Sequence, residues 1–74
     1  MNITFDSLNL FLALANDAEN WNGQPLLDIT KEQRGNLTQL KVANLLTTFR
    51  DDGCDFVIFS NESKALALNH GIKL

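Results

Sequence analysis

The chain has 74 residues and a formal net charge of −3, from six Lys and Arg against nine Asp and Glu. Hydrophobic residues make up 45% of it and charged residues 20%, which excludes a disordered tail and predicts a single domain over residues 1–74. One cysteine excludes an internal disulfide, and one cysteine with one histidine excludes a structural zinc site, so packing or self-association must stabilise the fold.

The first predicted element is a helix over residues 6 to 17 or 18, in which apolar residues recur at helical spacing. Thr4 or Asp6 is expected to cap its start. Leu10 and Leu14 widen the apolar stripe, so this helix is expected to be buried on more than one side, in a small core or against a second copy. The residues that would form such a protein interface are Phe5, Leu10, Leu14 and Trp21.

The segment Asn20–Pro25 contains Gly and Pro and is expected to end this helix, with Trp21 anchoring the turn on the core. The apolar residues Leu26, Leu27 and Ile29 are too few to decide between a short strand and one turn of helix. The conformation of this connector therefore stays open.

A second helix is predicted from Lys31, because Thr30-Lys31-Glu32-Gln33 has the form of a capping box. Asn44 is expected to end it, since Asn often replaces Gly in the left-handed position after a helix. Gly35 costs about 1 kcal/mol relative to Ala inside a helix. It either divides the segment into two helices or marks a close approach by another part of the chain.

A β-hairpin is predicted from two stretches rich in β-branched and aromatic residues, Leu45–Arg50 and Asp55–Phe59. Asp52-Gly53 between them is typical of a two-residue turn with positive φ at both positions. This turn predicts three cross-strand pairs, which are Arg50 with Asp55, Phe49 with Phe56 and Leu46 with Phe59.

A last helix is predicted from Asn61 to about Asn69, capped by Ser60 and ended by Gly71. Leu66 and Leu68 are expected to pack it on the core. The predicted fold is therefore a small α+β domain with the order helix, connector, helix, β-hairpin, helix.

Two stretches of the second half match a family pattern. Leu40-Lys41-Val42-Ala43-Asn44-Leu45 is similar to a Leu-Lys-x-x-Gly-Leu helix end, and Ser60-Asn61-Glu62-Ser63-Lys64 is similar to a Thr-x-x-Gly-Lys helix start. In these features the region from about Thr30 to Ile72 resembles the recognition helix, wing hairpin and following helix of MarR-like and ArsR-like winged-helix regulators. Size and acidity also resemble small winged-helix proteins of bacteriophages, some of which act on host proteins instead of DNA.

The sequence departs from the winged-helix pattern in two places. The first helix of a helix-turn-helix would have to fit into residues 22–29, which contain Gly23 and Pro25. The wing end reads Asp51-Asp52-Gly53-Cys54-Asp55, where DNA-binding wings commonly present Arg or Lys to a phosphate. Both departures weaken the expectation of DNA binding that the family carries.

Charge is spread unevenly along the chain, with −4 over residues 1–29, +3 over 30–50 and −2 over 51–74. The basic region coincides with the second predicted helix, where basic and polar side chains lie away from the Leu37–Leu40 face and Gln39 is placed farther round the outer surface. Such a face is compatible with contacts to phosphates and base edges. The candidate nucleic-acid-binding residues are Lys31, Arg34, Thr38, Gln39 and Lys41.

Electrostatics argues against DNA as the first choice of partner. Phosphate neutralisation supplies most of the non-specific affinity for DNA, and three or four cations are few. An acidic wing would also be repelled by the DNA backbone. The same charges fit a simple solvated helix face or a surface for a protein.

Neither a catalytic nor a metal site is predicted. Asp51, Asp52 and Asp55 lack the spacing of a calcium loop, and a hairpin turn accounts for them. Cys54 and His70 are expected to be a turn cysteine and a histidine favoured by the helix dipole, not a nucleophile and its base. We expect no cofactor and no small-molecule substrate.

The apolar run Leu10–Ala15 is too short to cross a bilayer, which needs about 20 residues, and no Lys or Arg precedes it as in a secretory signal. We therefore expect a cytoplasmic protein with no membrane partner. Two hypotheses follow from the sequence. The first is a non-enzymatic winged-helix regulator that acts through a protein partner or its own dimer, and the second is a DNA-binding transcriptional regulator that uses the basic second helix.

Overall fold

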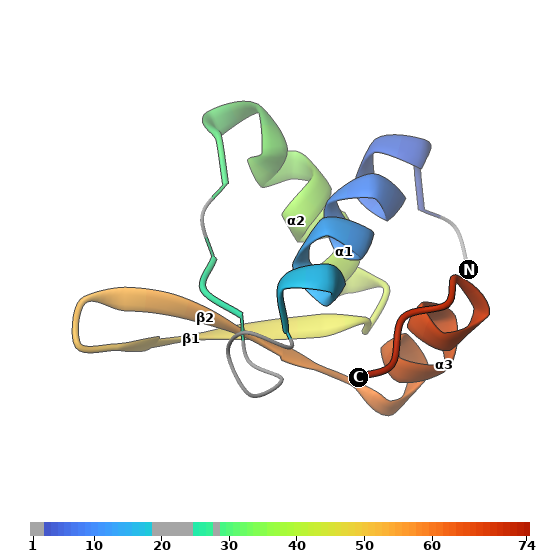
Figure 1. Cartoon of the computed structure of the whole chain (residues 1–74). Coiled ribbons are helices and arrows are strands. Elements are labelled where there is room, and N and C mark those ends of the chain that lie inside the picture. The colour runs from blue at the N-terminus through green and yellow to red at the C-terminus, as the bar shows by residue number, and fades with distance from the viewer. Residues whose placement is uncertain (1–2, 19–24, 28) are drawn as a thin grey trace.

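The computed structural model of the protein describes residues 3–18, 25–27 and 29–74. Its elements in chain order are α1 (Phe5–Asp17), the 3-10 turn η2 (Lys31–Gln33), α2 (Arg34–Val42), β1 (Leu46–Asp51), β2 (Cys54–Phe59) and α3 (Asn61–Asn69). This order and the α+β class confirm the fold predicted from the sequence. The helices α1 and α2 lie side by side on one face of the hairpin, whose turn projects away from them, and α3 lies at the opposite end of the hairpin (Figure 1).

The start of α1 is capped by Thr4 and joined to α2. The Thr4 hydroxyl accepts the Ser7 N–H at 3.1 Å, so one of the two predicted caps is confirmed. The Thr4 N–H in turn donates to Gln39 Oε1 at 2.6 Å, and the Ser7 hydroxyl donates to Asn36 Oδ1 at 3.2 Å. These two bonds fix the start of α1 against the side of α2.

The apolar face of α1 forms much of the core. Leu10 and Leu14, two of the four predicted interface residues, are only 5% and 6% exposed. Of the two roles that the sequence left open for them, these leucines therefore have the core role, and neither side chain is available to a partner. Phe5 is 75% exposed, and Trp21 lies outside the described residues.

The second helical segment begins as a 3-10 turn and continues as α2. Gln33 Oε1 accepts the Thr30 N–H at 2.9 Å, as the predicted capping box requires. The change to α-helix comes at Arg34, before Gly35, and a Cβ added at Gly35 would meet nothing within 4 Å. Neither explanation offered for Gly35 is therefore correct, because this glycine neither divides the helix nor makes room for a neighbour.

The end of α2 is set by Asn44, which has a φ of 61° and confirms the predicted stop. The Asn44 N–H donates to the Lys41 carbonyl and the Leu45 N–H to the Leu40 carbonyl, each at 3.0 Å. This pair of bonds is a Schellman motif, and Leu40 and Leu45 are both fully buried beside it. The motif turns the chain directly into the hairpin.

The hairpin has the predicted turn and register. Asp52 and Gly53 have φ values of 53° and 79°, as a two-residue type I′ turn requires. The rings of Phe49 and Phe56 stack with their centroids 5.5 Å apart. The three predicted cross-strand pairs are all present, namely Arg50 with Asp55, Phe49 with Phe56 and Leu46 with Phe59.

Residues 25–27 run along the free edge of β2. Leu26 forms an isolated antiparallel bridge with Phe56, and the Leu27 N–H donates to the Asp55 carbonyl at 2.7 Å. Of the two conformations left open for this connector, the described residues therefore adopt the extended one. The consequence for the site is that an apolar segment is held beside β2, facing α2.

The last helix begins and ends as predicted. The Ser60 hydroxyl accepts the Ser63 N–H at 3.2 Å, and Gly71 follows the helix with a φ of 78°. The packing prediction is half correct, because Leu66 packs on the core but Leu68 is 66% exposed. Ala67 is fully buried instead.

The core lies between α1, α2 and the inner face of the hairpin. Phe11 and Phe59 meet edge to face in it, with centroids 5.7 Å apart and planes at 86°. Its buried hydrophobic members are Leu10, Phe11, Leu14, Ala15, Ala18, Leu37, Leu40, Leu45, Leu46, Val57, Phe59 and Ala67.

Candidate functional site

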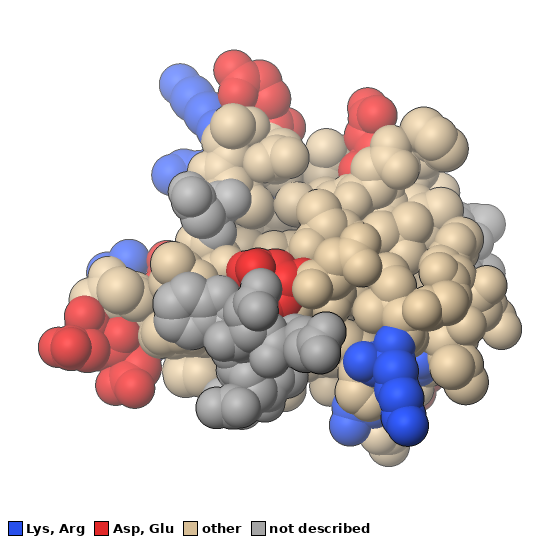
Figure 2. All heavy atoms as spheres, viewed as in Figure 1, with Lys and Arg blue, Asp and Glu red and all other residues tan. Residues whose placement is uncertain are grey.

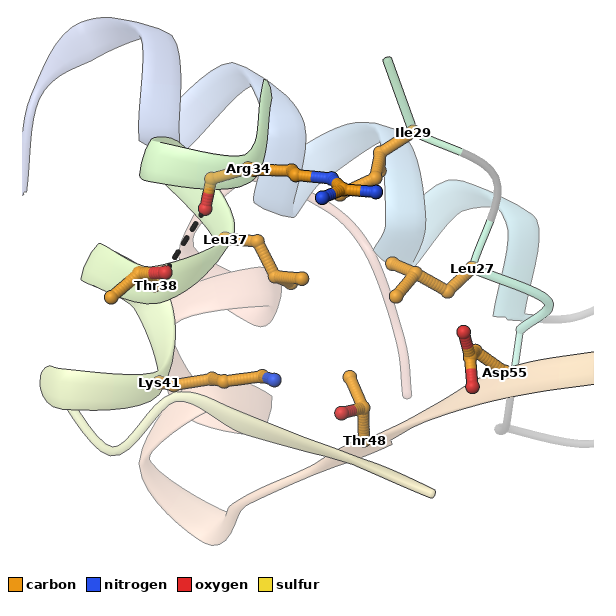
Figure 3. A pocket seen from close by; sticks show the side chains of 8 residues that line it. All are labelled: Leu27, Ile29, Arg34, Leu37, Thr38, Lys41, Thr48 and Asp55. Atoms are coloured by element: carbon orange, nitrogen blue, oxygen red, sulfur yellow. Dashed lines mark hydrogen bonds between the residues drawn. The ribbon is translucent and has the colours of Figure 1, made fainter. Parts of the chain in front are cut away.

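A cleft opens between α2, the hairpin and the extended segment beside β2 (Figure 3). Its volume is about 440 Å³, within the range of ligand-binding clefts in proteins. It is lined by Leu27, Ile29, Arg34, Leu37, Thr38, Lys41, Thr48 and Asp55. We call it the α2–hairpin cleft.

The wall formed by α2 is basic. Arg34 and Lys41 are seven residues apart on the helix, which places them on one face about 10.5 Å apart along its axis. Their side chains extend into the cleft on either side of Leu37, whose side chain lies between them (Figure 3). Thr38 lies at the rim, where its hydroxyl donates to the Arg34 carbonyl at 3.1 Å.

Among the described residues that line the facing wall, Asp55 on β2 is the one with a carboxylate. Arg50 on β1 binds this group through Nε at 3.1 Å and Nη2 at 3.5 Å. The hydrogen bond from Arg50 lowers the pKa of Asp55, aided by the charges of Arg50 and Lys41, and the same bond raises the pKa of Arg50. The carboxylate of Asp55 therefore lines the cleft while its charge is already neutralised by Arg50, which lies outside the cleft.

The two cleft cations are not balanced in this way. Across residues 3–18, 25–27 and 29–74, the pair Arg50–Asp55 is the one ion pair. Neither Arg34 nor Lys41 uses its side chain in a hydrogen bond or ion pair with any described residue. Lys41 acts on Asp55 only through its charge, so the described part of the cleft presents two cations that form no ion pair beside apolar surface.

Three of the five predicted nucleic-acid-binding residues, Arg34, Thr38 and Lys41, meet at this cleft. Lys31 is exposed in η2 but does not line it. Gln39 is a correction, because it lies half-buried against α1, where its side-chain oxygen accepts the Thr4 N–H, and not on the outer surface. The helical wheel misplaced it because the position of α1 cannot be derived from the second helix alone.

The turn of the hairpin forms a separate acidic end. Asp51 and Asp52 are both exposed there, and acidic atoms are seen at this projecting end as well as at the centre and the top of the view (Figure 2). Basic atoms lie beside the projecting end, over the start of the α2 region and, far from the turn, over α3. Exposed acids therefore occupy the tip of the hairpin, at a distance from the cations of α2.

The side chains considered for catalysis lie far apart. Cys54 begins β2 next to the exposed turn, whereas His70 follows the last residue of α3 at the opposite end of the molecule (Figure 1). Such a separation prevents them from acting together as nucleophile and base. The residues described contain no group of three or more His, Cys, Asp or Glu side chains that could hold a metal ion.

Half of the cleft was missed from the sequence. The sequence predicts only an apolar run of undecided structure at Leu27 and Ile29, and only part of a strand at Thr48. It predicts Asp55 as the partner of Arg50 but not as part of a site. Alternation along the strands does place Thr48 and Asp55 on the same face of the hairpin, which is the signal that could have found them.

A scan against models of protein families finds no match to this chain, and searches of curated proteins and of solved structures find none either. The helices seen in the described part of the chain are all too short or too polar to span a membrane.

Proposed function

We propose that the chain is a non-catalytic regulatory protein of winged-helix type that binds a protein partner through the α2–hairpin cleft. The observation that carries this proposal is the pair of cations Arg34 and Lys41, which form no ion pair with any residue that the structure describes, beside the half-buried apolar side chains of Leu27 and Ile29. Mixed clefts of this kind hold a polar or charged group of a partner in place while apolar contact supplies affinity.

The winged-helix assignment is supported by topology. The hairpin follows α2 directly, and residues 25–27 add a short third extended segment on the edge of β2. It is opposed by the absence of a helix in the described residues between Pro25 and Thr30, so no complete helix-turn-helix precedes α2 there. A surface without that motif is better suited to a protein than to the major groove.

Electrostatics favours a protein partner over DNA. Duplex DNA carries one negative charge per about 1.7 Å of its axis, so a bound duplex would bring several phosphates near the hairpin. The exposed carboxylates of Asp51 and Asp52 would repel those phosphates. A protein segment with only one or two carboxylates can reach Arg34 and Lys41 without meeting this repulsion.

The test is native purification of the full chain from its own cells, followed by mass spectrometry and measurement of nucleic-acid content. The variant with Arg34→Glu and Lys41→Glu reverses both cleft charges. The control with Lys64→Glu and Lys73→Glu reverses two exposed cations in and beyond α3 and gives the same net charge.

We expect one protein to co-purify in fixed ratio with the wild type and the control, and to be lost with the cleft variant. Recovery of nucleic acid without protein would overturn the proposal, as would equal recovery of the partner with both double variants. A dimer as the sole complex, found by sedimentation equilibrium, would assign the interface to a second copy.

DNA binding through α2 is the second candidate, because Lys31, Arg34, Thr38 and Lys41 are all exposed on this segment. It predicts duplex binding that weakens steeply between about 50 and 200 mM salt and is weakened further by Arg34→Ala. Absence of a gel shift at low salt would remove it.

A further inference from the structure

We propose that the α2–hairpin cleft receives a short extended segment in which two acidic residues flank two aliphatic residues. The inference rests on the proposed function, since it specifies the chemistry of the protein segment that the cleft would bind. It is argued from the spacing of the two cations, the apolar surface that faces them and the charge of the neighbouring hairpin end.

The distance between the two cations determines how far apart the two acidic residues of the bound segment should be. Arg34 and Lys41 are separated by about 10.5 Å along α2. In an extended polyproline II segment, residues three positions apart lie on the same side of the chain, about 9 Å apart. Two carboxylates at such positions would each meet one cation, because the long side chains of Arg and Lys bridge the small difference in spacing.

The surface facing the cations selects the residues between the acids. Leu37, between Arg34 and Lys41, is only 8% exposed, so the apolar surface of the cleft comes chiefly from the half-buried side chains of Leu27 and Ile29, which line it from the other side (Figure 3). In a segment with three residues per turn, the two residues between the acids point away from the α2 wall, so aliphatic side chains there would cover Leu27 and Ile29 and remove them from water. A purely acidic segment would leave them exposed.

This apolar surface also distinguishes the segment from other occupants. The hairpin end of a second copy carries acids at Asp51 and Asp52, but the turn that follows is Gly53 and supplies no aliphatic side chain. A sugar–phosphate backbone supplies charge without a matching apolar surface. Both occupants would satisfy the cations and leave Leu27 and Ile29 uncovered.

The probe is an acetylated and amidated hexapeptide, Gly-Glu-Leu-Leu-Glu-Gly, titrated into the full ¹⁵N-labelled chain and followed by amide chemical shifts. Two matched peptides replace both glutamates by lysine or both leucines by serine. We expect saturating shifts at cleft residues such as Ile29, Thr38 and Thr48, with none over α3. The serine peptide should bind about tenfold more weakly and the lysine peptide should not bind.

Matched variants locate the interaction. Arg34→Glu should weaken binding of the hexapeptide by about tenfold or more, whereas Lys64→Glu, an exposed charge reversal on α3, should leave it within about twofold. Equal binding of the three peptides, shifts centred on α3, or insensitivity to Arg34→Glu would overturn the proposal. So would a short duplex that gives the same cleft shifts at lower concentration.

Failure here is separable from failure of the proposed function. If no peptide binds but native capture of the partner still requires Arg34 and Lys41, the protein-binding role stands and the chemistry given for the segment is wrong. If capture does not require these cations, the proposed function itself fails.

Discussion

The carboxylate of Asp55 contacts Arg50 of the same hairpin on one side and faces the open cleft on the other. The side chains of the ion pair are 72% and 41% exposed, so solvent screens it and its contribution to stability is small. Its main effect is to hold the carboxylate of Asp55 in one orientation at the cleft wall. The pair therefore affects the site more than the fold.

Replacement of Arg50 should change the titration of Asp55. The pKa of Asp55 is lowered mainly by its hydrogen bond with Arg50, so Arg50→Gln should raise it toward the ordinary value of 3.8. Lys41→Gln should raise it less, because Lys41 acts on Asp55 only through its charge. Carboxyl ¹³C shifts followed against pH measure both changes, and Lys73→Gln, at the far end of the chain, is the control.

The same bond predicts the sign of a pH effect on stability. Because folding lowers the pKa of Asp55, the stabilisation is complete above its unfolded value near 3.8 and is lost as pH falls through the lower folded value. The urea midpoint of Arg50→Gln should thus lie slightly below that of the wild type at pH 7, and the two should converge in strong acid. A gap that widens in acid would contradict this assignment.

The position of a residue could be predicted from the sequence where a local rule determines it, and could not where an element distant in the sequence determines it. The pairing of Arg50 with Asp55 follows from the Asp52-Gly53 turn alone, since turn length sets the register. The position of Gln39 depends on where α1 lies, and the cleft role of Asp55 depends on residues 25–27. Strand alternation places Asp55 on the same face as Thr48, but neither the packing of Gln39 on α1 nor the closing of a cleft around Asp55 is encoded in local sequence.

At the level of elements, two glycines with opposite backbone requirements allow a matched experiment. Gly35 lies in α2 with open space where a Cβ would be, whereas Gly71 follows α3 with a φ of 78°. Gly35→Ala should raise the free energy of unfolding by about 0.5–1 kcal/mol, because alanine has the higher helix propensity. Gly71→Ala should lower it by about 1 kcal/mol, because a Cβ disfavours the left-handed conformation.

Urea denaturation of the two single variants and of the double variant measures these effects. The changes should be additive, since the two sites share no contact. Destabilisation by Gly35→Ala would mean that α2 is not continuous through this residue.

Element ends were predictable because their signals are local. Thr4, Asn44, Ser60 and Gly71 each end or begin a helix through bonds within a few residues. The inward face of α3 was less predictable, since Leu68 is exposed and Ala67 is buried. A nine-residue helix with apolar residues spread around it has no single face that periodicity can select.

In a molecule with so small a core, the loss of one buried side chain removes a large part of the free energy of unfolding. A chain of 74 residues is expected to have a free energy of unfolding of about 4–11 kcal/mol. Phe11 is fully buried and packs edge to face on Phe59, so Phe11→Ala should cost about 3–5 kcal/mol and leave little or no folded protein. Phe11→Leu keeps a branched apolar side chain and should lose less, and thermal unfolding followed by circular dichroism ranks the three chains.

The charge pattern of the whole molecule gives the last prediction. The hairpin end carries exposed acids (Figure 2), and we attribute the preference that we propose for a protein partner over DNA to these acids. Asp51→Lys and Asp52→Lys together remove two negative charges and add two positive ones, which changes the net charge from −3 to +1. Because hairpin and α2 would then present cations together, the double variant should shift a short duplex at about 50 mM salt and release it near 200 mM. The wild type should give no shift of the duplex at either salt concentration.

A matched variant with Glu62→Lys and Asp6→Lys has the same net charge but no basic hairpin end, and it should bind the duplex much more weakly. Equal binding by the two variants would show that net charge, and not the hairpin end, keeps DNA away.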